Sequence, residues 1–167
     1  MTRLSPAKVR ALLLAYAGGY VLNDYVDPES GYSRATLRAL LASGWIERAP
    51  ADENGLKFRA TAAGREALGI CLAPRPRGLR AALERAIRTF FPEVVAEEIE
   101  FQGNPRIRKG STFYVHVPLR GQFNDVDENL LWDAVKTMIR EMGWPIGIET
   151  WSLDSTVHIT WLAEEDE

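Results

Sequence analysis

The chain contains one cysteine, Cys71, and only two histidines among its 167 residues. A single cysteine excludes an intrachain disulfide framework and a zinc cluster built on several thiolates. No run of 18 or more apolar residues occurs, so the sequence predicts no membrane-spanning helix. The apolar stretch near the start carries Lys8 and Arg10 and lacks a small-x-small cleavage site. We therefore interpret it as a helix of the fold and expect a cytoplasmic protein.

Charge is unevenly distributed along the chain, although the net charge is only −3. Residues 1–69 hold 9 Lys and Arg against 7 Asp and Glu, and residues 70–110 hold 8 against 5. Residues 111–167 hold 3 against 11. Because nucleic acid attracts basic surfaces, this gradient predicts that any contact with nucleic acid lies in the first two thirds.

The segment GICLAPRPRG, residues 69–78, marks a boundary between two parts of the chain. Its two prolines prevent a continuous helix, and its glycines favour an irregular backbone. We therefore predict a domain at 1–69, a linker at 70–78 and a second domain at 79–167. Both parts mix helical and strand-like patterns, so the predicted fold class is α+β.

Helix signals come first in the N-terminal domain. Ser5 can cap a helix that begins at Pro6 and runs to about Ala17. The next stretch contains Pro28 and Gly31, which limit any second helix to a short one. Ser33 then caps a helix with leucines on one side, and a glycine at position 44 suits its C-terminal end.

Two strand-like runs, WIERA and LKFRA, follow on either side of the turn-rich PADENG, and Thr61 can cap a last short helix. This order of elements is that of a winged helix-turn-helix domain. SRATLRALLASGWIER resembles the recognition helix and first wing strand of MarR- and PadR-like bacterial regulators. LKFRATAAGREAL resembles their second wing strand and the T-x-x-G-R after it. The resemblance covers under half of the chain and implies binding of double-stranded DNA.

Candidate DNA-binding residues gather on the helix capped by Ser33. Arg34 and Arg38 are one turn apart on the side away from the leucines. A guanidinium group there can reach both a phosphate and the edge of a guanine in the major groove. The hydroxyls of Ser33 and Thr36 can donate to phosphate beside the free backbone N–H groups of the first turn.

Further cations lie on the predicted wing. Lys57 and Arg59 share one face of the second wing strand, and we expect Arg48 to flank them. They can follow a neighbouring phosphate or the minor groove. Against this, Asp52 and Glu53 at the wing tip disfavour close approach to phosphate, and a solvated surface is the alternative interpretation.

The second domain has the pattern αββαββ. A helix follows the linker and is stopped by Pro92, after which EEIEFQ and STFYVHVPL are candidate strands. A second helix lies within NDVDENLLWDAVKTMIREMGW, and the strands IGIETWSL and TVHITWLA close the domain. This order predicts one antiparallel sheet with both helices on one face. A two-residue turn at Asp154–Ser155 would place Trp151 opposite His158.

The uncovered face of this sheet is a candidate interface, because Tyr114, His116, Trp151 and His158 alternate onto it. Four uses remain open: a homodimer seam, a docking site for a protein partner, a small-ligand platform, or a solvent-exposed face. We favour the homodimer, since winged-helix regulators often bind two half-sites.

Arginines also accompany the linker and the helix after it. Arg80, Glu84 and Arg88 are spaced for ion pairing along one helix face, which we prefer to a role in DNA binding. Arg75 and Arg77 in the linker remain open.

No catalytic residue, metal ligand or cofactor is predicted. The two histidines lack a recognised metal-binding spacing, and Cys71 has no histidine near it in sequence. The sequence therefore predicts a non-enzymatic, sequence-specific double-stranded DNA-binding protein, a dimeric transcriptional regulator. The alternative is a non-enzymatic adaptor that docks a protein partner through the exposed sheet face.

Overall fold

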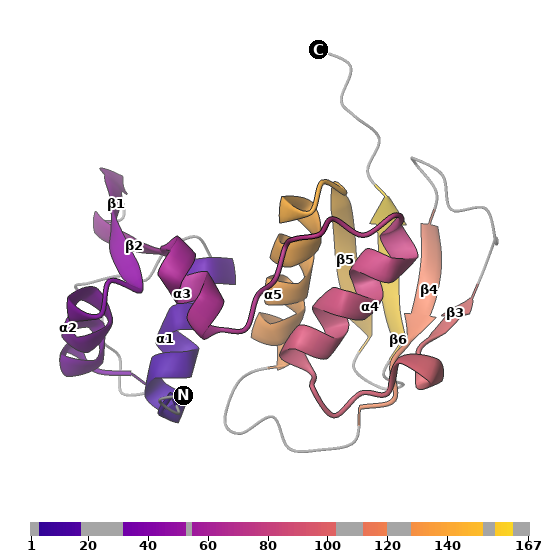
Figure 1. Ribbon diagram of the computed structural model, residues 1–167, viewed down its shortest axis with the longest axis horizontal. Coiled ribbons are helices and arrows are strands. Elements are labelled where there is room, and N and C mark those ends of the chain that lie inside the picture. The colour runs from indigo at the N-terminus through magenta and orange to yellow at the C-terminus, as the bar shows by residue number, and fades with distance from the viewer. Residues whose placement is uncertain are drawn as a thin grey trace, which may run out of the picture. The chain divides into compact units, whose positions relative to one another are not determined.

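The structure is a computed structural model (Figure 1). It describes residues 4–17, 32–52, 55–102, 112–119, 128–151 and 156–161, with the backbone alone at 51–52, 55–56, 149–151 and 156–161. The chain divides into two compact units, residues 1–71 with 123–130 and residues 72–122 with 131–167. Helices accompany antiparallel strands in both, which confirms the α+β class. Among the described helices, none has the length and apolarity needed to cross a bilayer.

The first unit contains three helices and one hairpin among its described residues. These are α1 (Pro6–Ala17), α2 (Arg34–Ala42), β1 (Ile46–Asp52), β2 (Gly55–Ala60) and α3 (Ala62–Ala67). The predicted helix from Pro6 to Ala17 is confirmed. The predicted short helix before Ser33 falls on residues 18–31, which lie outside the described residues.

The hairpin strands are longer than predicted, because β1 continues through part of the stretch that the sequence assigned to the turn. Asp52 pairs with Gly55, and the pairing is irregular between Ala49 and Asp52. Pro50 lies in this irregular stretch. Proline has no N–H for the strand ladder and is tolerated at such bulges.

The core of the first unit is built on α1, which is apolar over most of its surface. Its buried residues are joined by the leucines of α2 and by the base of the hairpin: Leu12, Leu13, Tyr16, Leu37, Leu40, Ile46 and Phe58. Burying a side chain of this size contributes about 1.5–3 kcal/mol. This burial fixes which side of α2 faces solvent.

The second unit follows the predicted order αββαββ. Its elements are α4 (Leu79–Phe90), a 3₁₀ turn (Ala96–Glu98), β3 (Glu100–Gln102), β4 (Thr112–His116), α5 (Glu128–Glu141), β5 (Ile146–Trp151) and β6 (Thr156–Trp161). The first three residues of α5 are assigned to the first unit. The antiparallel sheet has the strand order β3-β4-β6-β5. Figure 1 shows α4 and α5 over the same face of this sheet. The strand β3 is shorter than predicted because the 3₁₀ turn takes up residues 96–98.

Alternating burial identifies the covered face of the sheet. Phe113 and Val115 of β4 are buried, whereas Tyr114 between them is 47% exposed. The residues predicted to face inward from the second helix are all buried: Leu131, Val135 and Met138 of α5, and Met142 directly after it. The core therefore lies between the two helices and the Phe113 face of the sheet.

The predicted register of the last hairpin is wrong by two residues. Trp151 pairs with Thr156, and His158 pairs with Glu149, so four residues separate the paired ends. The predicted turn at Asp154–Ser155 lies outside the described residues. A slip of two residues keeps every residue on its original face, so Trp151 and His158 still share one.

The boundary between the two units, between residues 71 and 72, falls within the predicted linker. From there on the segment contacts the second unit. The guanidinium carbon of Arg75 lies 4.8 Å from the ring centre of Trp144. A side-chain nitrogen of Arg85 donates to the Pro74 carbonyl oxygen at 2.6 Å. These contacts give Arg75 and Arg85 structural roles.

Candidate nucleic-acid interface

The first turn of α2 is held by reciprocal hydrogen bonds between Ser33 and Thr36. The Ser33 Oγ accepts from the Thr36 N–H at 3.2 Å, and the Thr36 Oγ1 accepts from the Ser33 N–H at 3.3 Å. This capping box satisfies two backbone donors. The two hydroxyl oxygens lie 3.1 Å apart, so one donates to the other and one hydroxyl proton is left for a ligand.

The residue before this cap, Tyr32, is half-buried. Burial raises the pKa of its hydroxyl above the ordinary value of 10.0. Tyr32 also occupies the position whose apolar contacts commonly fix the entry of the chain into a helix.

The other end of α2 is closed by Gly44 in the left-handed conformation, with φ of 70°. The Gly44 N–H donates to the Leu41 carbonyl and the Trp45 N–H donates to the Leu40 carbonyl, both at 3.0 Å. These two bonds form a Schellman motif, which requires a positive φ at the glycine. The predicted role of Gly44 is confirmed.

Thr61 ties this helix end to the start of α3. Its N–H donates to the Trp45 carbonyl at 2.9 Å, and its Oγ1 donates to the Gly44 carbonyl at 2.6 Å. The same oxygen accepts from the Gly64 N–H at 3.1 Å, which confirms the predicted N-cap. A Cβ on Gly64 would overlap the Trp45 carbonyl oxygen. The threonine and glycine of T-x-x-G-R thus hold α3 against the loop after α2.

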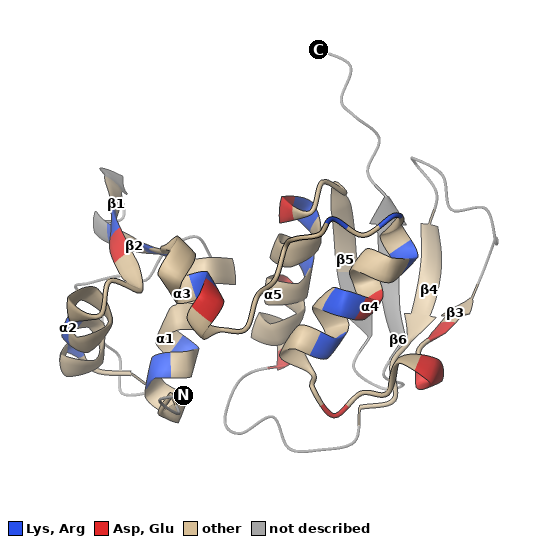
Figure 2. Cartoon of the chain, viewed as in Figure 1, with Lys and Arg blue, Asp and Glu red and all other residues tan. Residues whose placement is uncertain are grey.

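Arg34 and Arg38 lie on the exposed side of α2, and Leu37 and Leu40 on the opposite side are 2% and 0% exposed. Neither arginine forms an ion pair with another residue in the described ranges. Their spacing of four residues places them one above the other on the helix. In Figure 2, where Lys and Arg are blue and Asp and Glu red, the ribbon of α2 carries blue, and the adjoining hairpin carries both colours.

The hairpin divides its charged residues between two faces. Glu47 pairs with Arg59 and Ala49 pairs with Lys57, so the outward face carries both predicted wing cations. Arg48 pairs with Phe58, which is 2% exposed, and therefore occupies the other face. Arg48 does not flank Lys57 and Arg59, contrary to expectation.

Glu47 is a residue that the sequence interpretation missed. The Arg59 Nε lies 2.7 Å from the Glu47 Oε1, and the two side chains are 57% and 50% exposed. Opposite charges at directly opposed positions of a hairpin are the signal for such a pair. The signal requires the register, which the bulge between Ala49 and Asp52 conceals in the sequence.

The uncovered face of the second sheet aligns the predicted interface residues in two rows. One row contains Gln102, Tyr114, His158 and Glu149, and the next contains Glu100, His116, Thr156 and Trp151. Each histidine is therefore directly opposite a glutamate in the register, His116 opposite Glu100 and His158 opposite Glu149. Among the residues whose side chains are described, no three His, Cys, Asp or Glu gather in a metal-binding arrangement.

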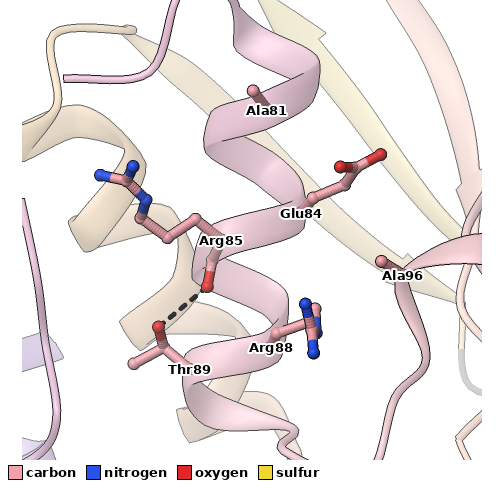
Figure 3. A pocket seen from close by; sticks show the side chains of 6 residues that line it. All are labelled: Ala81, Glu84, Arg85, Arg88, Thr89 and Ala96. Atoms are coloured by element: carbon pink, nitrogen blue, oxygen red, sulfur yellow. Dashed lines mark hydrogen bonds between the residues drawn. The ribbon is translucent and has the colours of Figure 1, made fainter. Parts of the chain in front are cut away.

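A shallow hollow of about 390 Å³ lies on the outer side of α4 (Figure 3). Glu84 and Arg88 leave the helix on the side where Ala96 lies, and Arg85 extends to the other side. The Thr89 hydroxyl donates to the Arg85 carbonyl at 2.8 Å, and Glu84 lies 3.7 Å from the Arg80 Nε. The predicted pairing of Arg80 with Glu84 is confirmed. The Thr89 hydroxyl and the Glu84 carboxylate thus have partners within α4 itself.

No protein-family model matches this chain, and no curated protein or solved structure shows a significant match to it.

Proposed function

We propose that the chain binds double-stranded DNA through its first unit, with α2 as the recognition helix and the β1–β2 hairpin as the wing of a winged helix. The single observation that carries this proposal is the exposure of Arg34 and Arg38 without an ion-pair partner in the described ranges. Both are exposed on a helix whose opposite side is buried, and neither is ion-paired within the described part of the chain. Arginines held in this way are suited to the edges of guanine and to phosphates.

The fixing of both ends of α2 supports the proposal. The capping box sets the start of the helix, and the Schellman motif sets its end. Thr61 joins that end to β2 and α3. A helix and hairpin connected at the base in this way can meet a duplex with little reordering, which preserves affinity.

In the proposed mechanism α2 enters the major groove with its first turn leading. Arg34 and Arg38 contact bases or phosphates, and Lys57 and Arg59 meet the neighbouring backbone. The remaining hydroxyl proton of the Ser33–Thr36 pair can donate to one phosphate oxygen. Phosphate contacts provide most of the affinity, so binding weakens as salt increases.

We further propose that the second unit makes the chain a homodimer, so that two copies of α2 read two half-sites as in a transcriptional regulator. The exposure of Tyr114 on the uncovered sheet face favours a contact there. Tyr114→Asp should convert a dimer into a monomer in analytical ultracentrifugation. A wild-type chain that is already monomeric at high concentration would refute the dimer.

The same exposed tyrosine also favours the alternative function, an adaptor that docks a protein partner on this face. The two functions depend on different surfaces. An adaptor would retain its partner after loss of Arg34, Arg38, Lys57 and Arg59, and would lose it when Trp151 is replaced.

DNA binding is tested by fluorescence anisotropy of the full chain with a random-sequence duplex at low salt. We expect Arg34→Ala/Arg38→Ala to weaken binding by about tenfold or more, since each base or phosphate contact contributes on the order of 1 kcal/mol or more. Arg80→Ala/Arg88→Ala is the matched control, because it removes the same charge from exposed positions in the second unit. Equal affinities of both double variants would refute the assignment of α2.

A further inference from the structure

One cation of the hairpin, Arg59, is held by the carboxylate of Glu47. Arg59 and Glu47 are directly opposed on β2 and β1, with 2.7 Å between Nε and Oε1. The Arg59 side chain is 57% exposed and the Glu47 side chain 50%, so a large ligand can reach the pair. Arg34 and Arg38 have no such partner within the described ranges.

The backbone around this pair is anchored in the core. Ile46, next to Glu47, and Phe58, next to Arg59, are each 2% exposed. Ile46 also pairs with Ala60 across the hairpin. The two charged residues are therefore held at opposed positions at the base of the hairpin.

A carboxylate and a phosphodiester compete for the same donors. Arginine binds both through its planar set of N–H groups, with similar charge-assisted geometry. A phosphate that contacts Arg59 must either replace Glu47 or approach its negative charge. Both alternatives reduce the gain from the contact.

We propose that Glu47 competes with the DNA backbone for Arg59 and thereby lowers the affinity of the wing for phosphate. This inference rests on the proposed function. It makes Glu47 a determinant of specificity: the reduction falls on backbone contacts, which every duplex offers, and leaves the base contacts of α2 unchanged. Specificity grows when the contacts common to all partners are weakened.

The test compares Glu47→Gln with the wild type in anisotropy titrations on a random-sequence duplex over a salt series. Exposed ion pairs contribute modestly, so we expect about two- to fivefold tighter binding of the variant. The slope of log K against log salt should become more negative, by up to about 0.9 if Arg59 gains one phosphate. Glu66→Gln on α3 is the matched control, since it removes an exposed carboxylate from the same unit.

The same substitution is then made in the Arg59→Gln background. Competition for Arg59 predicts that, in this background, Glu47→Gln increases DNA affinity by no more than Glu66→Gln does. Two results would overturn the role of Glu47 and leave the proposed function intact. One is the full increase in DNA affinity on Glu47→Gln when Arg59 is absent. The other is no increase in affinity when Arg59 is present and the wild type binds DNA. If no variant binds DNA even at low salt, the proposed function and this inference both fail.

Discussion

Replacing Gly64 by alanine tests how α3 is held against the loop after α2. The new Cβ would overlap the Trp45 carbonyl oxygen and lie 3.1 Å from the Leu12 Cδ1. Trp45 contributes backbone at this point, which cannot rotate away as a long side chain would. To make room, α3 must move outward and stretch the two hydrogen bonds that Thr61 donates to Gly44 and Trp45.

The expected size follows from three contributions. Overpacking a filled site costs about 1–3 kcal/mol, weakening two hydrogen bonds costs on the order of 1 kcal/mol, and the better helix propensity of alanine returns about 1 kcal/mol. Gly64→Ala should therefore lower the free energy of unfolding by about 2 kcal/mol. On propensity alone the same change would stabilise the helix.

Urea unfolding followed by circular dichroism measures the change, and hydrogen exchange of the Thr61 amide locates it in the first unit. Gly78→Ala is the control, because a Cβ at Gly78 meets nothing within 4 Å and its φ of 178° is open to any residue. The control should remain within about 0.5 kcal/mol of the wild type. A Gly64→Ala protein as stable as the wild type would refute the close packing of α3 on Trp45.

Two further stability predictions concern other built-in local features. Ser33→Ala removes the capping box and should lower the free energy of unfolding in urea by about 1 kcal/mol. Ser43→Ala removes an exposed hydrogen bond from the hydroxyl to the Ala39 carbonyl and should lower it little. Equal losses in the two variants would count against the cap. Gly143→Ala imposes a side chain at φ of 101° beside the Arg75 guanidinium, so we expect a loss of about 1–2 kcal/mol, and an unchanged melting midpoint would argue against that backbone.

Local signals in the sequence sufficed for most of the elements. Ser5, Ser33 and Thr61 mark helix starts, and Gly44 marks a helix end, because capping depends on residues within a few positions of one another. The faces of α5 and β4 also follow from their periodicity. In each case the determining residues are only a few positions apart in the sequence.

The pairing of strands could not be read in the same way. The predicted turn at Asp154–Ser155 gave a register two residues away from the observed pairing of Trp151 with Thr156. In the first unit, Asp52 pairs with Gly55, and an unbroken ladder from there would set Arg48 opposite Arg59. The bulge changes the register by one residue and sets Arg48 opposite Phe58 instead.

The candidate site was accordingly predictable only in part. The exposure of Arg34 and Arg38 follows from the leucines on the same helix. The pairing of Arg59 with Glu47 depends on the register of the hairpin, which no local pattern supplies. The engagement of the Ser33 and Thr36 hydroxyls with each other likewise emerges only from the folded helix start.

DNA binding by α2 is tested most directly by the salt dependence of binding to a duplex, compared between the wild type and Arg34→Gln/Arg38→Gln. If both arginines contact phosphates, the slope of log K against log salt should become shallower by about 1.8, and affinity at low salt should fall. If one of them contacts a base, the affinity should fall by more than the lost phosphate contacts, as measured by the change in slope, account for. Identical slopes and affinities of the wild type and Arg34→Gln/Arg38→Gln, with Arg80→Gln/Arg88→Gln also unchanged, would contradict DNA recognition by this helix.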